Sequence, residues 1–260
     1  MPKLPEGTLI HSYSPPYGIN HRGGFADIPL NVVNSVNIDG LGGSGTEWDD
    51  AVQNWKMPGR SLLSKKGANR TLNRLLVLWG ESLNRQNSDG LAVDEFREHI
   101  PPETTAAAWM SAISDISESH TDSMMVAWIN TNTVRLHPFP QSPESKALLR
   151  KLASENWVLA PEIFIAEQDG IWTDQLIRTL YSDWLGPWED LVPGIISKTV
   201  IGLNLVNQTP EFIKRQLNVC SQHELCRHSL GLALYKPIAM HDDQLKILNT
   251  YISEYINIII

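Results

Sequence analysis

The chain has 260 residues, of which 42% are hydrophobic and 19% are charged, a composition typical of folded proteins that excludes a disordered or fibrous chain. Its formal net charge of -8 argues against a uniformly basic nucleic-acid-binding protein. The two cysteines are too few for a disulfide scaffold and indicate a reducing compartment.

Residues 1–45 are rich in Pro, Gly, Asn and Ser and contain one partly alternating apolar stretch, IPLNVVNSVNI. That stretch predicts a short strand or an extended arm. The first twenty residues lack the continuous apolar segment of a signal peptide, and no later run is long enough to span a membrane. We therefore expect an irregular N-terminal arm on a soluble, cytoplasmic protein.

The segment NIDGLGGSGTEWDD spells the glycine pattern G-x-G-x-x-G of dinucleotide-binding loops. Three acids, Glu47, Asp49 and Asp50, fall in the first turn of the helix that would face the pyrophosphate, and they would repel it. The following stretch RSLLSKKGANR does not read as the second strand that such a fold requires, and no alternation of strands and helices is evident. We interpret the glycines as a turn before a capped helix, and we expect no cofactor.

Helical periodicity dominates from Thr46 onward. Two stretches are ambiguous: MMVAWINTNTVRLHPF predicts a small hairpin or a helix, and VPGIISKTVIGLNLV a strand or a buried helix. The nine tryptophans mostly fall at apolar helical positions, where core packing is expected. The predicted helices cover residues 70–86, LAVDEFREHI, TTAAAWMSAISDIS, 143–157, 173–185 (ended by Gly186-Pro187), 210–218, 222–235 and 242–256.

These elements predict a mainly α protein with a two-lobed helical body and at most a small β-hairpin. Three prolines in LHPFPQSPES indicate a linker between the lobes. The expected segments are an extended arm at 1–45, an N-terminal lobe at 46–135, a linker at 136–145, a C-terminal lobe at 146–250 and an apolar tail at 251–260.

The stretch CSQHELCRH places Cys220, His223, Cys226 and His228 within nine residues. Thiolate and imidazole are the ligands that zinc prefers, but four ligands on one helix cannot surround a tetrahedral ion. A partial site centred on His223 and Cys226, and completed by a distant residue, is the alternative to buried thiols beside half-exposed histidines. We assign no metal.

Basic residues concentrate between Lys56 and Arg85, a segment that contains seven Lys and Arg and one acid, Glu81. The rest of the chain contains 14 basic residues and 28 acids. Such a segment can follow a phosphate backbone without reading bases, although a solvated charged surface has the same composition. The candidate phosphate contacts are Arg60, Lys65, Lys66, Arg70 and Arg74.

The chain ends in YISEYINIII, and its terminal isoleucines would form an exposed apolar patch unless a neighbour covered them. We expect Ile256, Ile258, Ile259 and Ile260 to mediate assembly with other copies of the chain. A helical body, extended ends, a basic segment and no catalytic signature together predict a self-assembling structural protein, such as a viral coat or nucleocapsid subunit that binds single-stranded nucleic acid, and not an enzyme.

Two alternatives remain open. One is an enzyme of unassigned reaction, metal-assisted at the stretch from Cys220 to His228. The other is a helical effector or adaptor that binds a protein partner.

Overall fold

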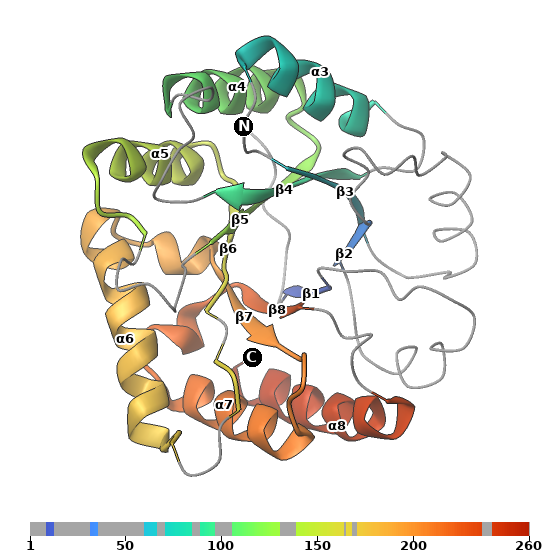
Figure 1. Ribbon diagram of the computed structural model, residues 1–260, viewed down its shortest axis with the longest axis vertical. Coiled ribbons are helices and arrows are strands. Elements are labelled where there is room, and N and C mark those ends of the chain that lie inside the picture. Colours follow the sequence, from blue (N-terminus) through green and yellow to red (C-terminus); the bar gives the residue numbers. More distant parts are fainter. Residues whose placement is uncertain are drawn as a thin grey trace.

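Strands and helices alternate along the chain in the computed structural model (Figure 1). The structure describes residues 9–12, 32–35, 60–66, 71–84, 89–96, 106–130, 139–163, 165–167, 171–235 and 241–259. The strands are β1 (Leu9–Ser12), β2 (Val32–Ser35), β3 (Arg60–Lys66), β4 (Gly90–Phe96), β5 (Met124–Ile129), β6 (Val158–Pro161), β7 (Val200–Asn204) and β8 (Gly231–Tyr235). The helices are α3 (Leu72–Leu83), α4 (Ala106–Ser119), α5 (Pro143–Ser154), α6 (Asp174–Leu191), α7 (Pro210–Gln222) and α8 (Asp242–Ile259), with short 3-10 helices η2 (Ile195–Lys198) and η3 (Cys226–His228).

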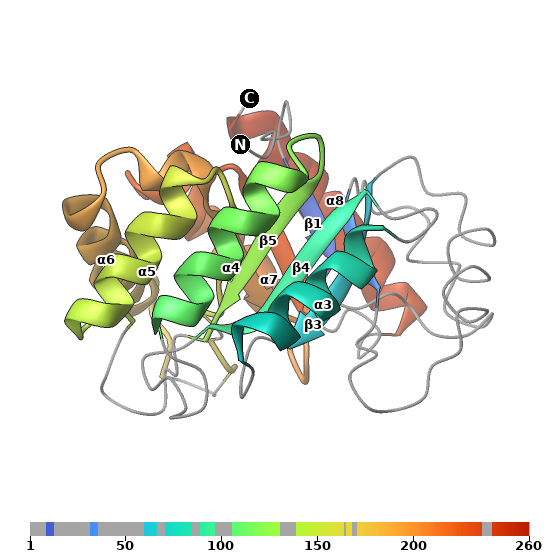
Figure 2. The ribbon, with the colours of Figure 1, turned by 90° about the horizontal axis from the view of Figure 1, so that it is seen from above.

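The strands form one parallel sheet that closes on itself. Their order is β6-β5-β4-β3-β2-β1-β8-β7, and each neighbouring pair is parallel. A parallel bridge between Leu159 and Thr199 joins β6 to the residue before β7 and so connects the two ends of this order. The described helices lie around the outside of the strands in both views (Figures 1 and 2). This architecture is the (β/α)8 barrel.

Among the described residues, a cluster of buried apolar side chains from strands β4 to β8 lies inside the barrel. Alternate residues of a barrel strand face inward, and the inner cluster follows that period of two. Its members are Ala92, Met124, Val126, Trp128, Val158, Ala160, Val200 and Ala233. Over the described strands the inside of the barrel is therefore lined by buried apolar side chains, as in the packed cores of such barrels.

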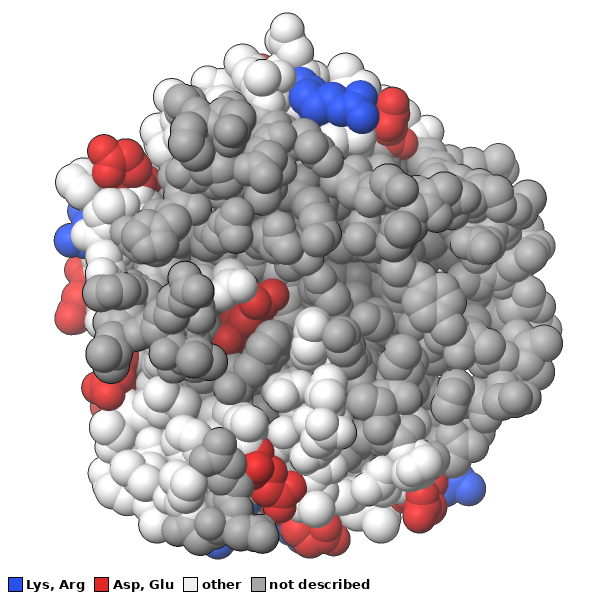
Figure 3. All heavy atoms as spheres, viewed as in Figure 1, with Lys and Arg blue, Asp and Glu red and all other residues white. Residues whose placement is uncertain are grey.

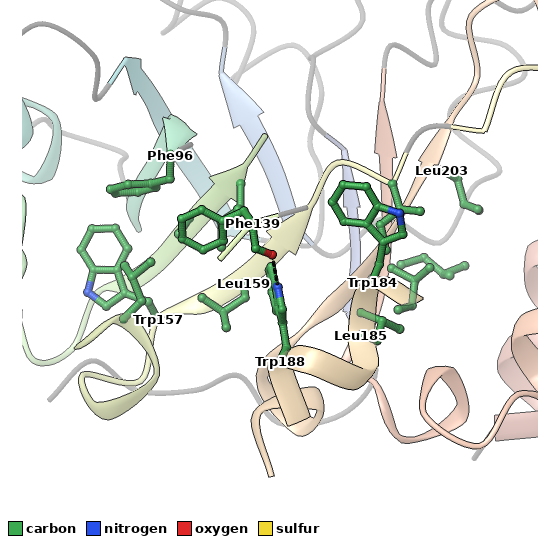
Figure 4. Packing of buried hydrophobic residues seen from close by; sticks show 14 of the residues in the cluster. Phe96, Phe139, Trp157, Leu159, Trp184, Leu185, Trp188 and Leu203 are labelled. Carbon is green, nitrogen blue, oxygen red and sulfur yellow. Dashed lines mark hydrogen bonds between the residues drawn. The ribbon is translucent and has the colours of Figure 1, made fainter. Parts of the chain in front are cut away.

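A second, larger apolar layer lies between the strands and the helices. Phe96 of β4 packs edge-on against Trp109 of α4, with ring centroids 5.0 Å apart, and against Trp157 at 6.3 Å. Further round this layer, the indole Nε1 of Trp188 donates a hydrogen bond to the carbonyl of Phe139 at 2.7 Å (Figure 4). These tryptophans are fully buried, which confirms the prediction that they pack in the core.

Hydroxyl side chains fix where helices α5 and α6 begin. Ser142 accepts a hydrogen bond from the backbone N–H of Ser145, and Pro143 occupies the first turn of α5. Thr173 caps α6 in the same way. These start points confirm the predictions at residues 143 and 173, because a side-chain acceptor satisfies an N–H that the helix itself leaves unpaired.

The prediction of a mainly α, two-lobed body is wrong. One continuous sheet takes strands from the segments assigned to the arm and to both lobes. The expected irregular N-terminal arm contributes β1 and β2, of which Val32–Ser35 lies in the stretch that predicted a strand or an arm. The expected C-terminal tail is the end of helix α8.

Individual elements were also misassigned. The stretches predicted as helices at LAVDEFREHI and after Gln222 contain β4 and β8, and RSLLSKKGANR contains β3. The stretch MMVAWI is a single parallel strand and not half of a hairpin. Helix α6 continues past Gly186-Pro187 to Leu191. Strands buried on both faces of a parallel sheet have continuous apolar runs, which periodicity cannot distinguish from buried helix.

The closed barrel differs from the open sheet in which the glycine pattern G-x-G-x-x-G binds a dinucleotide. A dinucleotide-binding sheet is open and changes direction at a switch point, whereas this strand order runs once around a closed ring. Residues 37–50 themselves lie outside the described residues. No described helix is both long enough and apolar enough to cross a membrane.

Candidate active site

Polar side chains gather where the strands end. In a parallel barrel all carboxyl ends lie on one face, and the loops there carry the chemistry of barrel enzymes. Asn130 follows β5, Glu162 follows β6, and Asn204 and Tyr235 are the last residues of β7 and β8; each is half-buried. The backbone N–H of Leu205 donates to the carbonyl of Tyr235 at 3.1 Å, which ties the last two ends together.

The carboxyl end of β4 contains two adjacent acids and an irregularity. The pairing of β4 with β5 shifts between Val93 and Phe96. Val93 pairs with Ala127 and Phe96 with Ile129, so β4 contains one more residue than β5 over this interval. Asp94 and Glu95 occupy this bulge. Bulges are frequent beside active sites, because the extra residue redirects the chain where a strand ends.

The end of β3 lies beside Asp94, on the side of β4 opposite β5. Lys66, the last residue of β3, is the register partner of Asp94, and Lys65 is the partner of Val93. Two of the basic residues that the sequence singled out therefore stand at the carboxyl face, beside the acids of β4. The prediction that they contact phosphates is untested.

The other predicted phosphate contacts are spread apart. Arg60 begins β3 at the opposite end of the barrel from Lys66. Arg74 lies in the first turn of α3 with an exposed side chain, and Arg70 lies outside the described residues. The structure thus brings Lys65 and Lys66 together but distributes the segment over two ends of the barrel and a helix.

The cysteine and histidine stretch lies on the outer layer, near the amino ends of the strands. Cys220 and Cys226 are free and buried, and His223 is 4% exposed, whereas His228 is exposed. His223 Nδ1 accepts hydrogen bonds from the backbone N–H groups of Leu225 at 3.2 Å and Cys226 at 3.4 Å. Within the described ranges no three His, Cys, Asp or Glu residues are grouped as metal ligands would be.

The terminal isoleucines belong to the last turns of α8. Ile256 packs partly against the outer core layer, and Ile258 is 62% exposed. For Ile259 only the backbone is described, and Ile260 lies beyond the described residues. Their role in assembly stays a prediction.

Two loops at the carboxyl face are joined by hydrogen bonds. Both carboxylate oxygens of Glu167, after β6, accept from Thr209, after β7: the backbone N–H donates at 2.7 Å and the hydroxyl at 2.9 Å. In return the backbone N–H of Glu167 donates to the side chain of Gln208 at 2.7 Å. The β6–α6 and β7–α7 loops are therefore held to each other by three bonds.

Charge is unevenly distributed over the molecular face that looks down the barrel axis (Figure 3). One group of acidic atoms of the described residues lies near the middle of this face, and other acidic groups lie around its edge together with the Lys and Arg atoms. A carboxyl group near the middle of this face is suited to proton transfer.

Several known structures resemble this barrel. A GH18 chitinase from Pseudoalteromonas aurantia matches with a TM-score of 0.62 and 12% identity, covering 93% of this chain and 99% of that chain. Active domain 2 of the thermostable chitinase from Pyrococcus furiosus, solved with chito-oligosaccharides, gives 0.64 and 11%, covering 98% and 96%. Orotidine 5'-monophosphate decarboxylase from Methanocaldococcus jannaschii gives 0.55 and 9%, covering 95% and 98%. At these identities the likeness establishes the fold.

No protein-family profile matches the sequence, and no curated protein matches it.

These findings overturn the interpretation of the chain as a coat or nucleocapsid subunit. That interpretation depended on a helical two-lobed body without catalytic features, whereas the chain folds as a barrel similar to those of the enzymes above. The same finding corrects the expectation that the protein is not an enzyme. The fold favours the enzyme alternative over the helical adaptor.

The acids at the strand ends could not be recognised from helical periodicity. Asp94 and Glu95 fall in a stretch that predicts a helix, where acids are common on the surface, and no motif includes Glu162. A usable signal was present in GLAVDEF, because a short apolar run with acids at its end is typical of a barrel strand that carries active-site groups.

Proposed function

We propose that this protein is a glycoside hydrolase whose active site lies at the carboxyl face of the barrel. The observation that carries the proposal is the pair of acids, Asp94 and Glu95, in the bulge that ends β4. Support comes from the likeness to two chitinases over almost the whole of both chains.

Hydrolysis of a glycosidic bond needs a carboxylic acid that protonates the leaving oxygen as the bond to the anomeric carbon breaks. It also needs a group that stabilises the positive charge on the sugar, either a second carboxylate or a neighbouring group of the substrate itself. Water then adds its hydroxyl to the anomeric carbon and returns a proton to the acid. We assign the acid to the β4 pair and the second carboxylate to Glu162, at the end of β6.

The remaining polar groups at this face would orient the sugar. Asn130, Asn204 and Tyr235 are half-buried at strand ends, where rigid backbone fixes their positions. Amide and phenol groups both donate and accept hydrogen bonds, which suits the hydroxyl groups of a sugar ring.

The first substrates to test are chito-oligosaccharides, since the Pyrococcus furiosus chitinase domain was solved with them. The full-length chain would be incubated with chitotetraose to chitohexaose, and with gluco- and xylo-oligosaccharides of equal length, and the products measured by mass spectrometry. Shorter products from any of these series support the proposal, and their pattern names the sugar. Intact substrate throughout contradicts it.

A further inference from the structure

The carboxylate of Glu167 connects two loops of the candidate active site, the β6–α6 loop and the β7–α7 loop. It accepts two hydrogen bonds from Thr209, the residue that caps α7. The hydroxyl of Thr209 also accepts from the backbone N–H of Phe212 at 3.2 Å. An anionic group at the start of a helix is stabilised by the positive end of the helix dipole, so this contact anchors the β6–α6 loop firmly.

Hydrogen bonds continue from this contact to the end of β7. Gln208 is 6% exposed; its side-chain oxygen accepts from Glu167, and its Nε2 donates to the carbonyl of Val206 at 2.8 Å. The backbone N–H of Val206 in turn donates to the side-chain oxygen of Asn204 at 3.0 Å. A continuous path therefore connects Glu167 to Asn204, one of the strand-end groups that we assign to the site.

The end of the β6–α6 loop that leads into α6 is also bonded to α7. Arg215 donates from Nη1 to the carbonyl of Trp172 at 2.9 Å, and its Nε lies 3.1 Å from the carboxylate of Asp174. The indole of Trp172 donates back to the carbonyl of Ala166 at 2.7 Å. Arg215, Asp174 and Thr209 are exposed, so water competes for their bonds, whereas the bond from the backbone N–H of Glu167 to the side chain of Gln208 is partly buried.

We propose that Glu167 is a positioning residue for the reaction assigned above. Its carboxylate fixes the β6–α6 loop, and with it Glu162, relative to Asn204 and α7. This inference rests on the proposed function. It predicts that loss of the carboxylate misplaces catalytic groups that Glu167 does not touch, which lowers kcat more than it raises KM.

The test compares Glu167→Gln with a matched control, Glu189→Gln. Glu189 also accepts two backbone hydrogen bonds, from Gly194 at 2.6 Å and Ile196 at 3.3 Å, but it lies in the last turn of α6, at the amino end of the barrel. Glutamine keeps the size of the side chain but removes its charge and replaces one acceptor oxygen by a donor. Both variants therefore lose a carboxylate that accepts two hydrogen bonds, at opposite ends of the barrel.

Two readouts are measured on each full-length variant: kcat and KM on the sugar that the wild-type chain hydrolyses, and amide hydrogen exchange of peptides spanning 162–167 and 204–210. Glu167→Gln is expected to lower kcat about tenfold with a change in KM below about threefold, and to speed exchange in both peptides. Glu189→Gln is expected to leave both readouts at wild-type values. Thr209→Val should resemble Glu167→Gln, and Thr209→Ser, which keeps the hydroxyl, should recover the wild-type kcat.

The outcomes separate this inference from the proposed function. An active wild-type chain whose Glu167→Gln variant keeps its kcat, or whose Glu189→Gln variant loses as much, overturns the positioning role alone. A wild-type chain that hydrolyses no sugar overturns the proposed function and the positioning role together. Faster exchange in the two loops of Glu167→Gln alone, together with the fall in kcat, supports the inference.

Discussion

The Oγ atom of Ser182 lies 2.9 Å from Nε2 of His223, within hydrogen-bond distance. Nδ1 of the same ring accepts from two backbone N–H groups, so the ring proton is assigned to Nε2. A histidine that donates to a serine cannot withdraw the proton of that serine as a general base. This pair therefore stabilises the packing of α6 against α7 and is not a nucleophilic site.

The stability of the protein is expected to depend on the ionisation of His223. Burial, and secondly the guanidinium of Arg178, lower the pKa of His223 below its usual value. The unfolded chain then binds a proton more readily than the folded one, so the contribution of His223 is complete above about pH 6.5 and is lost as the pH falls toward the lowered pKa. We predict a melting temperature that falls between pH 7 and pH 5.

The chain contains eight histidines, so the measurement is a comparison of variants. His223→Asn keeps an acceptor near Nδ1 but cannot ionise, and it should show a lower melting temperature at pH 7 and a shallower fall toward pH 5. His228→Asn, at an exposed position, should retain the wild-type pH profile. Equal profiles for wild type and His223→Asn would refute this role of His223.

Gly90, at the start of β4, permits a close approach of two barrel strands. A Cβ atom at this position would lie 1.9 Å from the carbonyl oxygen of Met124 in β5. Because the obstacle is backbone, relief requires the strands to separate. We predict that Gly90→Ala lowers the free energy of unfolding by about 3 kcal/mol or more, measured by urea denaturation.

The control for that substitution is Gly80→Ala in helix α3. There an added Cβ would meet only the side chain of Asn84, at 4.0 Å. Alanine restricts the unfolded chain and favours helix, so stability should rise by about 0.5–1 kcal/mol. A loss at Gly90 no larger than the effect at Gly80 would show that the strands can adjust.

A buried hydrogen bond joins helix α4 to the strand layer. The indole Nε1 of Trp157 donates to the hydroxyl of Ser117 at 2.9 Å, and both residues are fully buried. Ser117→Ala leaves a buried N–H without an acceptor and should cost about 1–3 kcal/mol in unfolding free energy. Ser119→Ala, at an exposed position of the same helix, should change stability by less than about 0.5 kcal/mol.

A double-mutant cycle isolates this bond. Trp157→Phe removes the donor, so adding Ser117→Ala to it should cost much less than Ser117→Ala costs alone. Additive effects of the two substitutions would mean that the bond contributes nothing to stability.

The parts of the fold that the sequence predicted are those whose signals are local. The starts of α5 and α6 follow from Ser142-Pro143 and Thr173, because a cap depends on only a few neighbouring residues. Helix α3 follows from apolar residues at helical spacing over three turns.

The strands could not be recognised in the same way, because their environment comes from distant parts of the chain. GLALY of β8 contains good helix formers and lies between β1 and β7, which no local pattern reveals. In GLAVDEF the apolar residues face both the inner and the outer layer, so they show no alternation. Because β4 has the local pattern of a helix, neither the barrel nor the site at the carboxyl ends of its strands follows from the sequence.

The most direct test of the account is the effect on kcat of neutralising the acids at the end of β4. Asp94→Asn, Glu95→Gln and a variant with both changes would be compared with Glu118→Gln, which alters an exposed acid near the end of α4, at the amino end of the barrel. Loss of the general acid is expected to lower kcat by about 10²–10⁴-fold in at least one β4 variant, with melting temperatures near wild type and full activity in Glu118→Gln. Full hydrolysis by the chain that lacks both acids would contradict the assignment of the active site to this face of the barrel.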